Sequence, residues 1–212
     1  MRTDLIRAPR SKIVAACAGL ALVLGVATRP VEAQTAEFTI DPDHFSIGFL
    51  VDHIGYAKVL GMFREASGSF TFDEKALALS NVKIAIKSAS VFSNQKERDE
   101  HLRSPDFLNA REFPEMTFVG KTAERTGERT GRIAGELTLL GKTQPITLDL
   151  RLNKAAVYPI ATGGLFSRPN YVVGVSARGA FKRSAFGMSY GLDQGWVGDE
   201  VELFIEFEAI RK

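Results

Sequence analysis

The stretch that decides the fold lies near the end of the 212-residue chain and reads Val201-Glu202-Leu203-Phe204-Ile205-Glu206-Phe207-Glu208-Ala209. Its odd-numbered positions are apolar, and three of its four even-numbered positions are glutamate. Because successive side chains of a β-strand point to opposite faces, this alternation is typical of a strand with one buried and one solvated face. The stretch therefore predicts a half-buried antiparallel strand.

The same alternation recurs along the chain, in residues 45–53, 82–87, 133–139, 146–152 and 173–181. Shorter strands are expected at 38–40, 59–72 and 116–121. Turn-forming sequences separate them at 73–75, 124–131 and 141–145. About eight antiparallel strands of this kind predict an all-β domain, and a closed barrel of eight strands is just wide enough to hold one small ligand.

One segment, residues 94–103, breaks the alternation. It contains no glycine, proline or β-branched residue, Asn94 can cap a helix with Glu97 three positions on, and Pro105 follows. We expect one short helix near residues 94–103, placed as a lid over one end of the barrel. The apolar residues that would face the barrel are Leu102, Phe107 and Leu108.

The inward phase of the predicted strands is rich in aromatic residues, drawn from fifteen phenylalanines in the chain. Two interiors fit this pattern: a solid core, or a lumen that holds an apolar guest. Periodicity does not separate the two. The residues that we expect to line the lumen or its mouth are Phe45, Phe49, Val51, His53, Phe63, Phe118, Leu137, Leu148, Phe181 and Phe186.

The N-terminus has the pattern of a signal peptide. Basic residues precede an uncharged run from Ile13 to Ala27, and Val31-Glu32-Ala33 supplies small residues at a cleavage site before Gln34. A membrane anchor is the rival interpretation, but fifteen apolar residues span roughly 22 Å as a helix, short of the ~30 Å hydrocarbon core. We expect residues 1–33 to be removed, leaving a periplasmic or secreted domain of residues 34–212.

The mature chain would have no cysteine, because Cys17 lies within the signal. Removal of residues 1–33 takes away five basic and two acidic residues, which changes the formal net charge from +2 to −1. A domain with this balance has no basic footprint for nucleic acid. A domain of about 180 residues without disulfides relies on its own apolar core.

Three short motifs resemble catalytic or metal-binding patterns without their context. Gly187-Met188-Ser189-Tyr190-Gly191 matches a serine nucleophile elbow, but no histidine follows residue 101. Gly141-Lys142-Thr143 ends like a phosphate-binding loop, yet Glu136 stands where its first glycine belongs. No pair among His44, His53 and His101 has close ligand spacing, so we expect neither catalysis nor a metal site. His53 continues the inward phase of its strand, either as a hydrogen-bonded rim residue or as a contact for the polar end of a guest.

Several segments together resemble the YceI family of bacterial periplasmic and secreted proteins. They are residues 39–46, 52–55, 97–108, 113–114 with 117–118, 135–145, 186–187 and 198–201. The run Arg-Asp-x-His-Leu-Arg-Ser-x-Asp-Phe at 98–107 is a specific signature. The resemblance implies a lipocalin-like antiparallel barrel with an elongated apolar tunnel for polyisoprenoids or similar long-chain amphiphiles. The chain departs from the family at 155–171, where a Trp-Gly pair is absent, so the mouth is expected to differ there.

The leading hypothesis is therefore non-catalytic carriage of an isoprenoid quinone, a polyprenyl lipid or a similar amphiphile, with no cofactor. The alternative is a periplasmic quinone, redox or stress-response accessory that works with a membrane partner. A transient contact with the membrane or a membrane protein, and a homodimer, are both compatible with the sequence. No nucleic-acid partner is expected.

Overall fold

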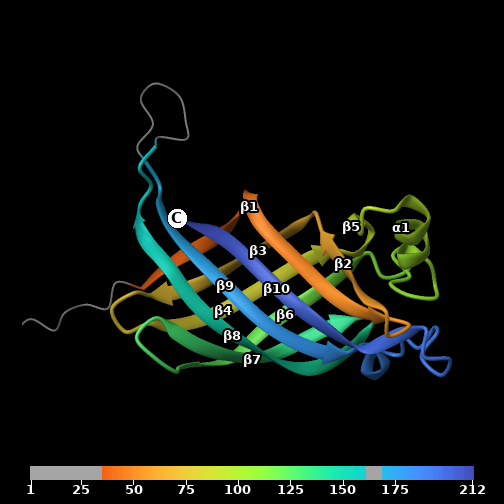
Figure 1. Cartoon of the computed structure of the whole chain (residues 1–212). Coiled ribbons are helices and arrows are strands. Elements are labelled where there is room, and N and C mark those ends of the chain that lie inside the picture. Colours follow the sequence, from red (N-terminus) through yellow and green to blue (C-terminus); the bar gives the residue numbers. More distant parts are fainter. Residues whose placement is uncertain (1–34, 161–168) are drawn as a thin grey trace, which may run out of the picture. The chain divides into compact units, whose positions relative to one another are not determined.

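The structure, a computed structural model, describes residues 35–160 and 169–212, which form an antiparallel β-barrel with one short helix (Figure 1). The expected signal peptide lies outside these residues. The strands are β1 Thr35–His53, β2 Ala57–Phe63, β3 Ala66–Asp73, β4 Ala78–Lys87, β5 Val91–Phe92, β6 Glu115–Arg125, β7 Thr130–Leu139, β8 Lys142–Val157, β9 Tyr171–Lys182 and β10 Val197–Arg211. The helix is α1, Lys96–Arg103, and two 3-10 turns are η1, Ser88–Ser90, and η2, Arg183–Phe186.

The barrel closes because the first strand pairs with the last. Around the ring the order is β1, β3, β4, β6, β7, β8, β9 and β10, and β10 pairs antiparallel with β1 from Phe38–Arg211 to His53–Val197. This arrangement confirms the all-β, eight-stranded prediction. Strands β2 and β5 extend the sheet at the end of the barrel that carries α1, where β2 pairs with the second half of β1.

The first strand is longer than the two strands predicted at 38–40 and 45–53, because both belong to β1. They are joined by a bulge between Ile40 and Phe45, where β1 has more residues than the facing segment of β10. Conversely, the single strand expected at 59–72 is divided into β2 and β3, which pair with different halves of β1. The prediction of one strand there was wrong, because the bend in β1 has to be matched by a break in its neighbour.

The turn between β7 and β8 is tighter than the predicted connection at 141–145. Leu140 and Gly141 alone form it, with positive φ values of 53° and 69°. Two such residues make the tight hairpin turn whose twist matches that of paired strands. Pro145 therefore lies inside β8, opposite Glu136, and not in the turn.

The predicted helix is present, but it begins differently. Gln95, and not Asn94, caps α1 by accepting a hydrogen bond from the Arg98 backbone N–H. Asn94 instead has a positive φ of 62°, which turns the chain into the helix. Phe107 and Leu108 are buried against the barrel, and Leu102 packs against the same core.

The bulge in β1 holds an ion pair on the barrel surface. His44 Nδ1 donates to Asp41 Oδ2 at 3.0 Å, and the Asp43 backbone N–H donates to Asp41 Oδ1 at 3.0 Å. Burial alone would raise the pKa of the Asp41 carboxyl, but these two hydrogen bonds outweigh burial and lower it. The hydrogen bond to Asp41 raises the pKa of His44, and nearby Glu208 and Asp43 add to this effect.

We predict that His44 titrates above the ordinary imidazole value of about 6.5. Because folding raises the pKa of His44, the charged ring stabilises the fold at pH values below the unfolded pKa, and this contribution is lost as the pH rises through the folded pKa. NMR titration of the ring protons measures it. In Asp41→Asn the pKa of His44 should fall toward the ordinary value, whereas Asp43→Asn should change it less. An unchanged His44 pKa in Asp41→Asn would contradict this account.

Candidate functional site: an apolar lumen

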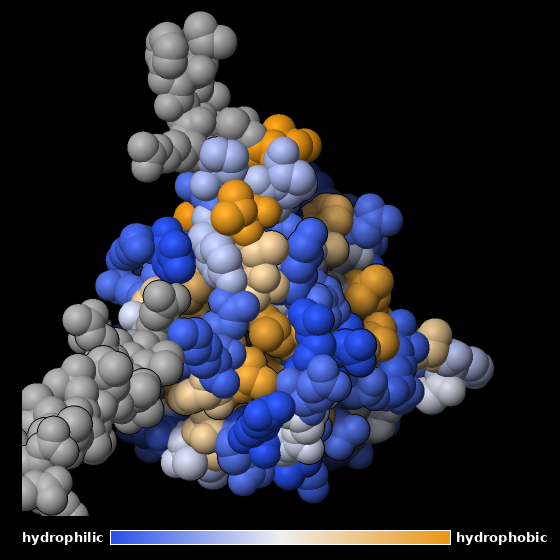
Figure 2. All heavy atoms as spheres, turned by 90° about the vertical axis from the view of Figure 1, so that its left-hand side faces the viewer, coloured by the Kyte–Doolittle hydropathy of each residue, from blue (hydrophilic) through white to orange (hydrophobic). Residues whose placement is uncertain are grey.

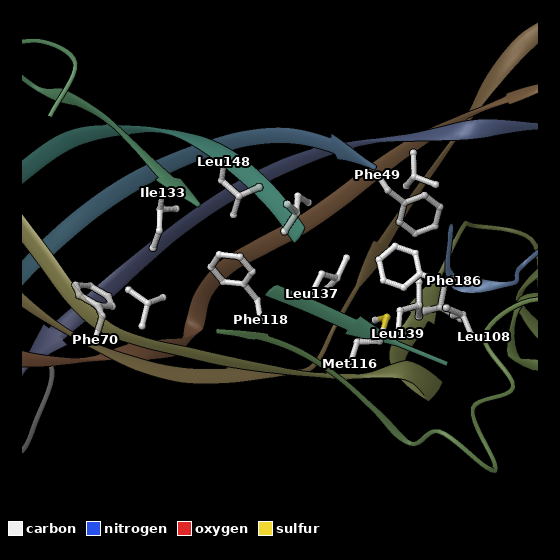
Figure 3. Close-up of a cluster of buried hydrophobic side chains, with 14 of the residues drawn as sticks. Phe49, Phe70, Leu108, Met116, Phe118, Ile133, Leu137, Leu139, Leu148 and Phe186 are labelled. Carbon is white, nitrogen blue, oxygen red and sulfur yellow. The ribbon is translucent and has the colours of Figure 1, made fainter. Parts of the chain in front are cut away.

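The barrel encloses a cavity of about 740 Å³ that runs between its two ends. This volume is within the range of sites for small molecules and cofactors. Figure 3 shows Ile133, Leu148, Phe118 and Leu137 converging from surrounding strands, with Phe70 toward one end and Phe49 toward the other. The same alternation that predicted the strands supplies the walls: Phe45, Ile47, Phe49 and Val51 of β1 and Val201, Leu203, Ile205 and Phe207 of β10.

Glycines at inward positions help to shape the walls. Gly61 faces inward on β2, and its Cα lies beneath the Phe49 ring of the paired strand, so that an added Cβ would be 2.2 Å from Phe49 Cζ. At Gly135 on β7, an added Cβ would be 2.5 Å from the Phe118 ring and 2.6 Å from the Val119 carbonyl oxygen. Large rings therefore lie flat against the strands instead of standing across the lumen.

Nine of the ten residues predicted to line the lumen do so, namely Phe45, Phe49, Val51, His53, Phe63, Phe118, Leu137, Leu148 and Phe181. Phe186 is buried at 2 % exposure but is outside the lining, where its ring packs edge-on against Phe181 at 5.4 Å between centroids. It belongs to η2 and not to a strand, so strand periodicity gives no phase for it. Phe186 belongs to the buried cluster near Phe49, Leu139 and Leu108 (Figure 3).

Polar side chains of the lining lie at the two ends. At the α1 end they include Asp52, His53, Glu97, Arg98 and His101, and at the other end Glu124, Arg125, Arg129, Thr130 and Arg132. The middle of the lumen offers a guest only apolar contact. The arrangement fits a long apolar chain whose polar group, if it has one, remains at an end.

A cluster of rings lines the α1 end of the lumen. The His101 ring contacts Phe107 and Tyr190 edge-on, with centroids 4.9 Å and 4.8 Å apart, and His101 Nε2 is 2.9 Å from Asp106 Oδ2. Trp196 continues the cluster beyond Tyr190, at 6.4 Å between centroids. The cluster thus joins α1 and the segment after it to the loop before β10.

Within the signature run at 98–107, three charged side chains hold α1 in place. Asp99 is buried, and its Oδ1 accepts hydrogen bonds from the Ser93 backbone N–H at 2.7 Å and the Ser93 hydroxyl at 2.5 Å. Arg98 donates to the Ser93 hydroxyl and carbonyl, and Arg103 donates to the Ala89 and Val91 carbonyls. The helix is thereby fixed to the segment that follows β4.

A buried arginine holds the adjoining loop at residues 187–196. Arg183 is 1 % exposed, and its guanidinium donates to the carbonyls of Gly198 at 2.7 Å, Met188 at 2.9 Å and Val197 at 2.7 Å. Burial lowers the pKa of Arg183, and Asp199 offsets part of that effect. The Arg183 guanidinium thus anchors the backbone on both sides of the loop at the mouth.

At the opposite end, hydrophilic residues surround a small apolar group near the centre of the view (Figure 2). The arginines at this end are bound to the protein itself. Arg129 donates to the carbonyls of Leu152 and Asn153, and Arg132 Nε donates to Asp149 at 2.9 Å. These contacts tie the β6–β7 turn to β8.

Ser189 lies in a turn after η2, without the strand before it and the helix after it that a nucleophile elbow requires. Asp41, His44 and Glu208 bring three potential ligand atoms within 4.8 Å of one another, but on the outer surface at the β1 bulge, where His44 is already hydrogen-bonded to Asp41. Among the described residues, no helix is long and apolar enough to cross a membrane.

Comparison with known proteins is consistent with this geometry. The family model described as YceI-like domain matches residues 38–209. The chain belongs to the YceI-like domain family. A UPF0312 protein of Yersinia enterocolitica is 38 % identical over 181 residues, which cover 84 % of this chain and 88 % of that protein. The resemblance seen in the sequence is thereby confirmed.

Solved structures share the barrel. The YceI protein of Campylobacter jejuni is 30 % identical, with a TM-score of 0.66, over 76 % of this chain and 90 % of that one. A polyisoprenoid-binding domain from Saccharophagus degradans is 12 % identical, with a TM-score of 0.60, over 84 % of this chain and 99 % of that one. The second likeness is one of fold.

Sequence reasoning missed the residues of the α1-end mouth that lie outside regular strands: Ile54, Arg183, Tyr190 and Trp196. No periodicity marks them, because they lie in turns and loops. The divergence expected at 155–171 falls partly on residues 161–168, outside the described part. What is described there is the hydrogen bond from the Tyr158 N–H to the Asn170 carbonyl, at 2.7 Å, between β8 and β9.

We predict that Arg183→Met lowers the free energy of unfolding by about 2–4 kcal/mol, because three carbonyls near the mouth lose their donor. Urea unfolding followed by circular dichroism measures the change. The matched control is Arg178→Met, since Arg178 pairs with Glu206 on the outer surface and should contribute under about 1 kcal/mol. Equal losses in the two variants would contradict the anchoring role.

The lumen also predicts tolerance to a larger side chain. In Leu148→Trp the added ring can enter the cavity, so the free energy of unfolding should change by less than about 1 kcal/mol, whereas overpacking a solid core costs roughly 1–3 kcal/mol. Thr147→Trp, on the outer face of the same strand, is the control. A loss of more than about 1 kcal/mol in Leu148→Trp alone would indicate a filled interior.

Proposed function

We propose that this YceI-like protein is a non-catalytic carrier that holds one polyisoprenoid, such as an isoprenoid quinone or a polyprenyl lipid, or a similar long-chain amphiphile along its lumen. The observation that carries the proposal is the distribution of polarity. The middle of the lumen is walled by apolar side chains, and the charged residues of the lining lie at its ends. A chain of repeated apolar units with a polar end group has the complementary pattern.

Burial of the guest supplies the affinity. Each 100 Å² of apolar surface removed from water is worth roughly 2.5 kcal/mol, from which the cost of immobilising the guest is subtracted. Neither polar chemistry in the middle of the lumen nor a bound cofactor is needed. The name of the Saccharophagus degradans neighbour, a polyisoprenoid-binding domain, supports the choice of ligand class, although its sequence is only 12 % identical.

The proposal includes export. Residues 1–33 have the pattern of a signal peptide, and the barrel begins directly after it at Thr35. A carrier in the periplasm or outside the cell would shield an isoprenoid chain from water on its way between membranes or partners.

The experiment is a calorimetric titration of delipidated residues 34–212 with geranylgeraniol and with a short-chain isoprenoid quinone. We expect one guest per barrel, recovered chemically unchanged. Leu148→Trp should weaken binding at least about tenfold, because the ring occupies guest volume, while Thr147→Trp should bind as the wild type does.

Two results would refute this function. One is a delipidated wild type that takes up neither probe, and the other is equal affinity in the Leu148→Trp and Thr147→Trp variants. Conversion of the probe to another compound would point to catalysis and would contradict the non-enzymatic part of the proposal.

A further inference from the structure

Exposed apolar side chains gather at the α1 end of the barrel. Of the eight large apolar side chains that are exposed in residues 35–160 and 169–212, six belong to the β1–β2 hairpin, β2 and the loop before β10. We call four of them the apolar rim: Ile54, Tyr56, Tyr190 and Trp196, with exposures of 47 %, 90 %, 38 % and 48 %. Leu60 and Met62 extend it along β2.

The rim is continuous with the lumen. Ile54, Tyr190 and Trp196 line the cavity and are at the same time exposed to solvent. The hairpin and the loop are held together, because the Ile54 N–H donates to the Trp196 carbonyl at 3.1 Å. Through these three side chains, apolar surface extends from the solvent at the rim into the cavity.

The conformation of Ile54 is unusual for its residue type. It has a positive φ of 56° at the tip of the hairpin, followed by Gly55 at 72°. Asparagine or glycine adopts this conformation at lower cost than a β-branched residue does. An isoleucine there gives up turn stability and presents apolar surface to the solvent, which points to a contact outside the barrel.

The charges near the rim indicate what kind of contact this is. Lys58 is hydrogen-bonded to Glu202, and Glu200 and Asp52 are also close enough to act on it. Three carboxylates against one ammonium give this side no attraction for an anionic surface. Tryptophan and tyrosine with apolar neighbours are the residues that favour the boundary between water and hydrocarbon.

We propose that the apolar rim docks onto the surface of an electrically neutral lipid bilayer, so that the mouth of the lumen opens toward the hydrocarbon. The biological role of docking, transfer of a guest between the bilayer and the lumen, rests on the proposed carrier function. The two are separable by experiment, because docking needs no isoprenoid. The free edge of β2 between residues 57 and 61 also offers a place for a second copy of the chain, and the test distinguishes that outcome.

The probe is the single tryptophan of the chain, Trp196. Residues 34–212 are mixed with phosphatidylcholine vesicles that contain no isoprenoid, and sedimentation and Trp196 emission are measured. We expect co-sedimentation with a shift of the emission to shorter wavelength. Phosphatidylglycerol in the vesicles, or 0.5 M salt, should change the affinity by less than about twofold, since charge is not the driving force.

The decisive variant is Ile54→Asn. It should weaken vesicle binding at least about fivefold through loss of apolar contact, while the thermal midpoint stays the same or rises because asparagine suits the turn. The matched control is Ile160→Asn, since Ile160 is 67 % exposed but follows β8, away from the rim. It should bind vesicles as the wild type does.

Several outcomes would overturn the proposal. They are no co-sedimentation of the wild type, binding that requires phosphatidylglycerol, and equal losses in Ile54→Asn and Ile160→Asn. A Trp196 shift that depends on protein concentration without vesicles, together with a dimer mass by light scattering, would assign the rim to a second copy of the chain. Vesicle binding by a protein that ignores geranylgeraniol would refute carriage and leave docking intact.

Discussion

The antiparallel pairing of β1 with β10 is the constraint on which the rest of the structure depends. Once the first and last strands are joined, the ring has no open seam between them, and every second residue of each strand has to face the inside. Inward glycines such as Gly61 and Gly135 let the rings of Phe49 and Phe118 lie along the wall. A closed sheet with such walls retains a lumen where an open sheet would have packed against another layer.

This dependence explains what could be predicted from the sequence. A period of two is a local property, so the strands and the inward phase of residues such as Phe118 and Leu148 were predictable. Whether the interior was solid or hollow was not, because that depends on how side chains of several strands meet. The break between β2 and β3 was also missed, since it depends on a bulge in another strand, at Ile40–Phe45 of β1. Phe186 was misplaced because it lies on a 3-10 turn with no strand phase.

The two ends of the barrel differ in structure. At one end the arginines of the β6–β7 turn are bound to carbonyls and carboxylates of the barrel itself. At the other, the hydrogen bonds of Asp99, Arg103 and Arg183 hold a helix and a loop around an apolar opening. The most recognisable sequence run of the YceI-like family thus serves, in this chain, to build a mouth. The lining between the ends is apolar.

The central claim is that the lumen holds a guest, and native mass spectrometry of the intact protein purified from its own cells tests it most directly. The account predicts a species heavier than the polypeptide by the mass of one isoprenoid lipid, which dissociates on collisional activation to give the bare chain. A spectrum that shows only the mass of the polypeptide, under conditions that preserve other lipid complexes, would contradict it.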